Sequence, residues 1–154
     1  MSCYNFDNMG VFLGIRVNDG FVFSAGQIKF TSKYDGKTAT GLVGSSLNFT
    51  WSFSGDVDSV IWGLKKNGVN VIKNGGKLVY LDKNGPVPVT VPSAYKQRVS
   101  GSGDISSGQV TFSLSLIRMS DKGFYGCNIQ PKNIVDLEKF DSVYLAVKGK
   151  YLLA

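Results

Sequence analysis

Few side chains in this chain could do acid–base, covalent or metal chemistry, and their spacing does not favour it. The sequence contains no histidine, so the commonest general base and the commonest metal ligand are missing. Asp56 and Asp58 lie two residues apart, and we predict solvated turn residues rather than an acid–base pair or a calcium site. No helical pattern follows Gly101-Ser-Gly103 to bind phosphate at its N-terminus. We therefore predict no enzyme activity, no metal and no cofactor.

The two cysteines, Cys3 and Cys127, are too few for a disulfide framework and cannot make a zinc site. We predict that Cys127 points into a core, where burial leaves a thiol unreactive. Cys3 lies near the N-terminus, and chain termini are usually held loosely. We predict two free thiols; the alternative is a Cys3–Cys127 bridge formed by an N-terminal segment that folds back over the core.

The chain is basic, with 17 Lys and Arg against 11 Asp and Glu, a formal net charge of +6 and a pI near 9.3. The basic residues are scattered, and Lys65-Lys66 is their only adjacent pair. A nucleic-acid site needs a basic stripe with interleaved aromatic residues, so we predict no nucleic-acid binding and a weak attraction to acidic proteins or glycans. No apolar run approaches the roughly 18 residues of a membrane span, so we predict no membrane insertion by this segment.

The elements that position these residues are predicted to be short β-strands joined by tight turns, as in a β-sandwich. Hydrophobic residues make up 43% of the chain and glycines number 19, a composition that favours strands over helices. Apolar and polar residues alternate over 47–53, the pattern of a strand buried on one face. Prolines 86, 88 and 92 exclude a central strand across 84–93. The other predicted strands are residues 27–31, 40–43, 60–64, 69–73, 77–81, 95–100, 110–116, 124–129 and 141–148.

We divide the chain into an N-terminal extension at residues 1–26, one domain at 27–150 and a tail at 151–154. The extension is predicted to be either a hairpin around Asn18-Asp19-Gly20 or the remnant of a leader, and both interpretations stay open. If the domain is displayed on a cell, its leader and membrane anchor are expected outside this chain. Asn48-Phe-Thr50 is a glycosylation sequon, and the alternation of its strand turns Asn48 toward solvent.

Several groups of residues, in order along the chain, resemble a V-set immunoglobulin domain over residues 27–150. They are Gly44…Leu47…Phe49…Trp51, Trp62, Arg98-Val-Ser-Gly-Ser102, Leu114…Leu116 and Asp121…Gly123…Tyr125…Cys127. The resemblance implies an all-β Greek-key sandwich of about nine strands, with strands C′ and C″ at 69–73 and 77–81. A narrower likeness, carried by Trp62-Gly-Leu-Lys-Lys-Asn-Gly68 and by Trp51, is to the membrane-distal V-set domains of hydroid (cnidarian) allorecognition receptors.

The resemblance also assigns roles in the core. Trp62 is then the tryptophan that packs against the centre of strands B and F, Tyr125 is the tyrosine corner, and Cys127 is the F-strand cysteine. Its disulfide partner is missing, because the matching B-strand position holds Trp51. A disulfide there would contribute about 4–5 kcal/mol in the chain-entropy model. We predict that a buried Trp51 offsets a good part of this, including a sulfur–aromatic contact of about 0.3–1.5 kcal/mol with Cys127.

In the same family the arginine of strand D pairs with the aspartate of the E–F corner, here Arg98 and Asp121. An arginine can bind a carboxylate with two parallel hydrogen bonds, so we predict a salt bridge that closes one end of the sandwich. The alternative is a loose surface pair worth at most about 1 kcal/mol.

The predicted binding region is the loop at 130–140, which corresponds to the third hypervariable loop of the family. Ile134, Val135 and Leu137 are apolar residues in a charged loop, a pattern typical of an interface with a polar rim. The alternative is that Ile134 and Leu137 pack back onto the end of the sandwich. The adjacent outward positions of the G-F-C-C′ sheet are predicted to be Gly63, Lys65, Gly126, Asn128 and Tyr144, with the glycines allowing close approach and Tyr144 anchoring a partner.

These features predict a cell-surface recognition or adhesion module that binds another protein. The narrower resemblance implies that the partner is a like domain on an opposing cell. Two other classes stay open: an intracellular structural immunoglobulin module of a filament protein, and a glycan-binding V-set lectin that uses Lys65 or Lys132.

Overall fold

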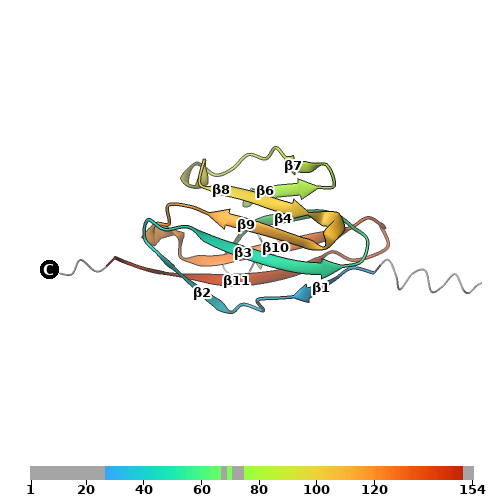
Figure 1. The fold of residues 1–154 in the computed structure, drawn as a ribbon, viewed down its shortest axis with the longest axis horizontal. Helices are drawn as coiled ribbons and strands as arrows, with labels where there is room; N and C mark the ends of the chain where they lie inside the picture. Colours follow the sequence, from blue (N-terminus) through green and yellow to red (C-terminus); the bar gives the residue numbers. More distant parts are fainter. Residues whose placement is uncertain (1–26, 67–68, 71–74, 151–154) are drawn as a thin grey trace, which may run out of the picture.

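The computed structural model describes residues 27–66, 69–70 and 75–150, and in them the chain forms two β-sheets packed face to face (Figure 1). The first sheet has four strands in the order β1-β3-β9-β8, all with antiparallel neighbours. Its strands are β1 (Lys29–Ser32), β3 (Leu47–Ser54), β8 (Val99–Asp104) and β9 (Gln109–Leu114). These strands correspond to those predicted at 27–31, 47–53, 95–100 and 110–116, which are strands A, B, D and E of the V-set family.

The second sheet has the order β2-β11-β10-β4-β6-β7, with β5 also paired to β4. Strand β2 pairs in parallel with β11 and the other neighbours are antiparallel. Its strands are β2 (Thr38–Leu42), β4 (Val57–Lys66), β5 (Val69–Asn70), β6 (Lys77–Asp82), β7 (Gly85–Val87), β10 (Gly123–Pro131) and β11 (Lys139–Lys148). Short 3₁₀ turns form at η2 (Ser93–Tyr95), η3 (Ile105–Ser107) and η4 (Met119–Asp121). The predicted all-β V-set sandwich is confirmed.

The core lies between the two sheets, because alternate residues of each strand point inward. Trp62 on β4 stacks 5.4 Å from Phe112 on β9 and 5.5 Å from Tyr125 on β10, measured between ring centroids. The hydroxyl of Tyr125 donates to the carbonyl oxygen of Asp121 at 2.7 Å, which is the hydrogen bond of a tyrosine corner. The inward residues of β3 and β9 are Phe49, Trp51, Phe53, Val110, Phe112 and Leu114.

The predicted identities of C′ and C″ are wrong. The strand paired along the middle of β4 is β6, which was predicted to be C″. The predicted C′ at 69–73 contributes only β5, and residues 71–73 lie outside the described residues. The outermost strand is β7, where Pro86 is tolerated because one side of an edge strand needs no partner.

Strands D and E also differ from the prediction at their ends. Tyr95 belongs to η2, and strand D begins only at Val99. Strand E ends at Leu114, and Leu116 is 61% exposed with a φ of +51°, whereas Ile117 is buried. The guanidinium of Arg98 binds the carbonyl oxygens of residues 115 and 116. The chain therefore turns at this point, and Ile117 instead of Leu116 points into the core.

A buried carboxylate joins the two sheets where a V-set domain carries its disulfide. Asp141 lies on β11 opposite Cys127 in the register of β10 and β11. It accepts a hydrogen bond of 2.7 Å from the indole nitrogen of Trp51 on the other sheet. It also accepts from the backbone nitrogens of Tyr34, at 2.7 Å, and Asp35, at 2.9 Å. This role of Asp141 was not predicted from the sequence.

Cys127 is a free, fully buried thiol among the described residues, and Cys3 lies outside them. Burial raises the pKa of Cys127, and the nearby Asp141 raises it further. The protonated thiol therefore behaves as a small apolar core residue.

Arg98 and Asp121 close one end of the sandwich with a bidentate ion pair. Both N–O distances are 2.8 Å, and the side chains are only 4% and 2% exposed. Burial opposes ionisation of Asp121, but hydrogen bonds from the Arg98 side chain and the Arg118 backbone outweigh it and lower the pKa of Asp121. The guanidinium also donates to the carbonyl oxygen of Ala94. This is a buried clamp and not a loose surface pair.

We expect Trp51→Phe to lower the free energy of unfolding more than Trp62→Phe does. Both changes remove similar ring volume, but the indole nitrogen of Trp62 has no hydrogen-bond partner among the described residues, whereas that of Trp51 binds Asp141. The additional loss should be about 1–3 kcal/mol, the range for a hydrogen bond to a charged group. Urea denaturation of the two variants measures it, and equal losses would show that the Trp51–Asp141 bond is not stabilising.

We expect Asp121→Asn to cost about 3–5 kcal/mol, because it leaves the guanidinium of Arg98 buried without a counter-charge. The double variant Arg98→Met/Asp121→Leu should lose less than Asp121→Asn, because it removes both charges. The folded-state pKa of Asp121 is lowered, so its stabilisation is present above the unfolded pKa near 3.9 and is lost as pH falls. Denaturation curves between neutral and acid pH test this; an Asp121→Asn variant as stable as wild type at neutral pH would contradict it.

Candidate functional site

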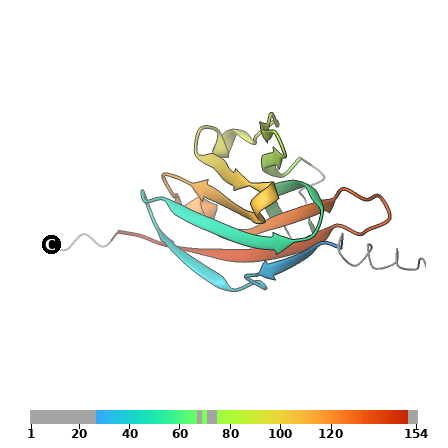
Figure 2. The same ribbon diagram turned by 45° about the vertical axis from the view of Figure 1, so that its right-hand side comes forward.

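The loop between β10 and β11 presents three apolar side chains to solvent. Ile134, Val135 and Leu137 are 95%, 76% and 75% exposed, so the alternative in which Ile134 and Leu137 pack onto the sandwich is wrong. The loop projects beyond the end of the sheets (Figure 2). The charged residues that flank the three are Lys132, Asp136, Glu138 and Lys139.

Backbone hydrogen bonds hold this apolar loop in a defined shape. The amide of Lys132 donates to the carbonyl oxygen of Asp56 at 3.0 Å, which ties the start of the loop to the turn between β3 and β4. At the tip, Asn133 accepts from the amide of Val135 with its side chain and from the amide of Asp136 with its carbonyl oxygen, both at 3.1 Å. The apolar side chains are therefore presented by a turn with internal hydrogen bonds.

A second candidate surface lies on the outer face of the same sheet, where aromatic rings gather around one lysine. Lys65 on β4 places its Nζ 5.5 Å from the ring centroid of Phe124 and 5.6 Å from that of Phe140. The Phe124 ring meets that of Tyr144 edge to face at 4.9 Å. Phe124 is 40% exposed. We call Lys65, Phe124, Phe140 and Tyr144 the aromatic cluster; cation–π contacts and a half-exposed ring suit it to a protein interface.

The prediction that Gly63 and Gly126 allow a partner to approach this face closely is wrong. Gly63 and Gly126 are both buried, and a methyl group on Gly126 would meet the ring of Phe140. Asn128 is only 1% exposed, and its amide nitrogen donates to a carboxylate oxygen of Glu138 at 3.1 Å. In this conformation Asn128 is therefore not a contact residue, whereas Lys65 and Tyr144 remain half-exposed.

Phe124 and Phe140 were not singled out from the sequence, although a signal for both exists. Each directly precedes an inward residue, Tyr125 or Asp141, so strand alternation alone turns it to the outer face. That the ring of Phe140 covers Gly126 depends on its side-chain conformation, which alternation does not predict.

The other predicted site residues lie apart from these surfaces. Asn48 is exposed on β3, in the opposite sheet, and its side-chain Oδ1 accepts a hydrogen bond from the hydroxyl of Ser113 at 2.7 Å. Asp56 and Asp58 are exposed near the turn between β3 and β4. No cluster of three potential metal ligands occurs within residues 27–66, 69–70 and 75–150. In the same part of the chain, no helix is long and apolar enough to cross a membrane.

Comparisons with known proteins agree with this geometry. No curated protein sequence matches the chain. The family model of the immunoglobulin V-set domain matches residues 36–145, which is more than half of the 154 residues. That span runs from the turn before β2 to the middle of β11 and includes Trp51, Arg98, Asp121 and Tyr125. The chain therefore belongs to the immunoglobulin V-set family.

Proposed function

We propose that this domain is a cell-surface recognition module that binds another protein through the exposed loop at 132–138 and the aromatic cluster. V-set domains are generally binding modules rather than enzymes, commonly act in recognition or adhesion, and are typically extracellular. The observation that carries the proposal is the exposure of Ile134, Val135 and Leu137. Burying one such side chain in an interface stabilises a complex by about 1.5–3 kcal/mol.

The two surfaces are continuous along the chain. Strands β10 and β11 flank the loop, and the same strands carry Phe124, Phe140 and Tyr144 of the aromatic cluster. One partner could therefore cover an apolar loop and an aromatic face together, with Lys132 and Glu138 at the polar rim.

Asn48 supports the assignment of the binding face. It is exposed on the four-stranded sheet, and the bond from Ser113 engages its oxygen and leaves its amide nitrogen for modification. A glycan on Asn48 would shield that sheet and leave the opposite sheet open to a partner. Glycosylation of Asn48 is part of the proposal.

The proposed partner is a like domain on an opposing cell, as the resemblance to hydroid allorecognition receptors suggests. Two copies each carry a net charge of +6, so their mutual repulsion should be screened by salt, with a Debye length of about 10 Å at 0.1 M. Homophilic affinity should then rise with ionic strength, whereas affinity for an acidic partner should fall.

We expect Ile134→Asp/Leu137→Asp to weaken self-association by at least about tenfold, because it places charges in the apolar centre of the interface. Sedimentation at increasing protein concentration and aggregation of coated beads measure the effect. The matched control is Leu42→Asp: Leu42 is 50% exposed but pairs with Lys148, at the far end of β11 from the loop. The Leu42→Asp variant should self-associate like wild type.

A wild-type domain that stays monomeric at high micromolar concentration, and whose coated beads do not adhere, would overturn the homophilic form of the proposal. Equal weakening by Leu42→Asp and by the loop variant would show that the loop is not the contact.

A further inference from the structure

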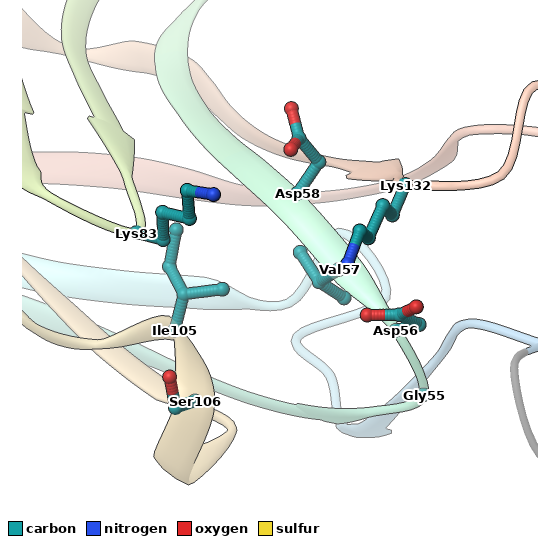
Figure 3. Close-up of a pocket in the computed structure, with 8 residues that line it drawn as sticks. All are labelled: Gly55, Asp56, Val57, Asp58, Lys83, Ile105, Ser106 and Lys132. Carbon is teal, nitrogen blue, oxygen red and sulfur yellow. The ribbon is translucent and has the colours of Figure 1, made fainter.

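A pocket of about 300 Å³ opens at the loop end of the sandwich (Figure 3). It lies between the turn before β4, the turn between β6 and β7, the 3₁₀ turn η3 and the start of the loop after β10. Its lining residues are Gly55, Asp56, Val57, Asp58, Lys83, Ile105, Ser106 and Lys132. Aromatic-cluster residues and the exposed apolar residues of the loop do not contribute to it.

The pocket combines an apolar floor with charged walls. Val57 and Ile105 are almost completely buried, and their side chains face each other across the pocket (Figure 3). Lys132 extends from one wall toward Val57, and Lys83 extends from the opposite wall, so both ammonium groups are directed inward. The carboxylate of Asp56 also turns toward the pocket, whereas that of Asp58 points away from it.

No ion pair joins any two of these four charged side chains. An anionic group placed between the two ammonium groups would accept charge-assisted hydrogen bonds from both. The Asp56 carboxylate and the Ser106 hydroxyl can in addition bind hydroxyl groups.

The geometry points to a binding site for an acidic monosaccharide, a sugar ring that carries a carboxylate. Its carboxylate would lie between Lys83 and Lys132, its hydroxyls would bind Asp56 and Ser106, and its C–H face would pack on Val57 and Ile105. A simple carboxylate would leave the apolar floor and Asp56 unused, and a neutral sugar would leave the two lysines unpaired. The volume is at the small end of ligand pockets, which begin at about 300 Å³, so the site suits one sugar unit at the end of a glycan.

This site shares Lys132 with the loop surface proposed above, and its other lining residues lie outside that surface and outside the aromatic cluster. The two proposals are separable because Ile134→Asp/Leu137→Asp leaves every pocket residue unchanged, and substitutions at Lys83 leave the loop unchanged.

The test is a titration of the ¹⁵N-labelled full chain with D-glucuronate, followed by amide chemical shifts. Glucuronate should shift the amides of Val57, Ser106 and Lys132 in a saturable way, and both D-glucose and acetate should bind at least about tenfold more weakly. The variant Lys83→Met/Lys132→Met should weaken glucuronate binding by at least about tenfold. The control Lys96→Met/Lys148→Met removes the same charge from exposed lysines outside the pocket and should bind like wild type.

The absence of saturable shifts at these three amides up to high millimolar glucuronate would overturn the proposal. So would equal affinities of the pocket variant and wild type, or an equal loss in the control variant, which would indicate attraction by net charge alone. Acetate that binds as tightly as glucuronate would also overturn it, because the pocket would then accept any carboxylate, such as an acidic side chain of a protein partner.

Discussion

The buried carboxylate of Asp141 links the two sheets by a hydrogen bond at the position where a V-set domain carries its disulfide. It lies on β11 of one sheet, accepts a hydrogen bond from Trp51 of the other, and accepts two more from the backbone of the connection between β1 and β2. A B–F disulfide acts mainly by restricting the unfolded chain, whereas this hydrogen-bonded group acts only in the folded state. Its stabilisation requires that all three donors reach the carboxylate, because an ionised group in the core is costly unless it is fully bonded.

Because Asp141 stands in place of the B–F disulfide, the described core does not require an oxidising compartment. Cys127 is free and buried beside Asp141, so the described core contains no bond that a reducing environment would break. The missing disulfide is therefore compatible with either an oxidising or a reducing compartment.

The two ends of the sandwich differ in the burial and pairing of their side chains. At one end Arg98, Asp121 and Tyr125 form a buried network that fixes the connections between strands D, E and F. At the other end the loop with Ile134 and Leu137 extends into solvent, and a charged pocket opens next to it. The polar groups at the first end are buried and hydrogen-bonded, whereas the apolar side chains at the loop end are exposed.

The sequence by itself determined the strand alternation, because period-2 burial is a local property of each strand, and its resemblance to V-set domains indicated the fold family. It also identified the apolar loop and the partners Arg98 and Asp121. Only the tertiary structure showed that Trp51 binds Asp141, that Phe140 covers Gly126 and that Asn128 is buried. It alone brought Lys83 and Lys132 to one pocket. Contacts between residues far apart in the sequence depend on sheet order and side-chain conformation, and neither is encoded in the spacing of residues along a single strand.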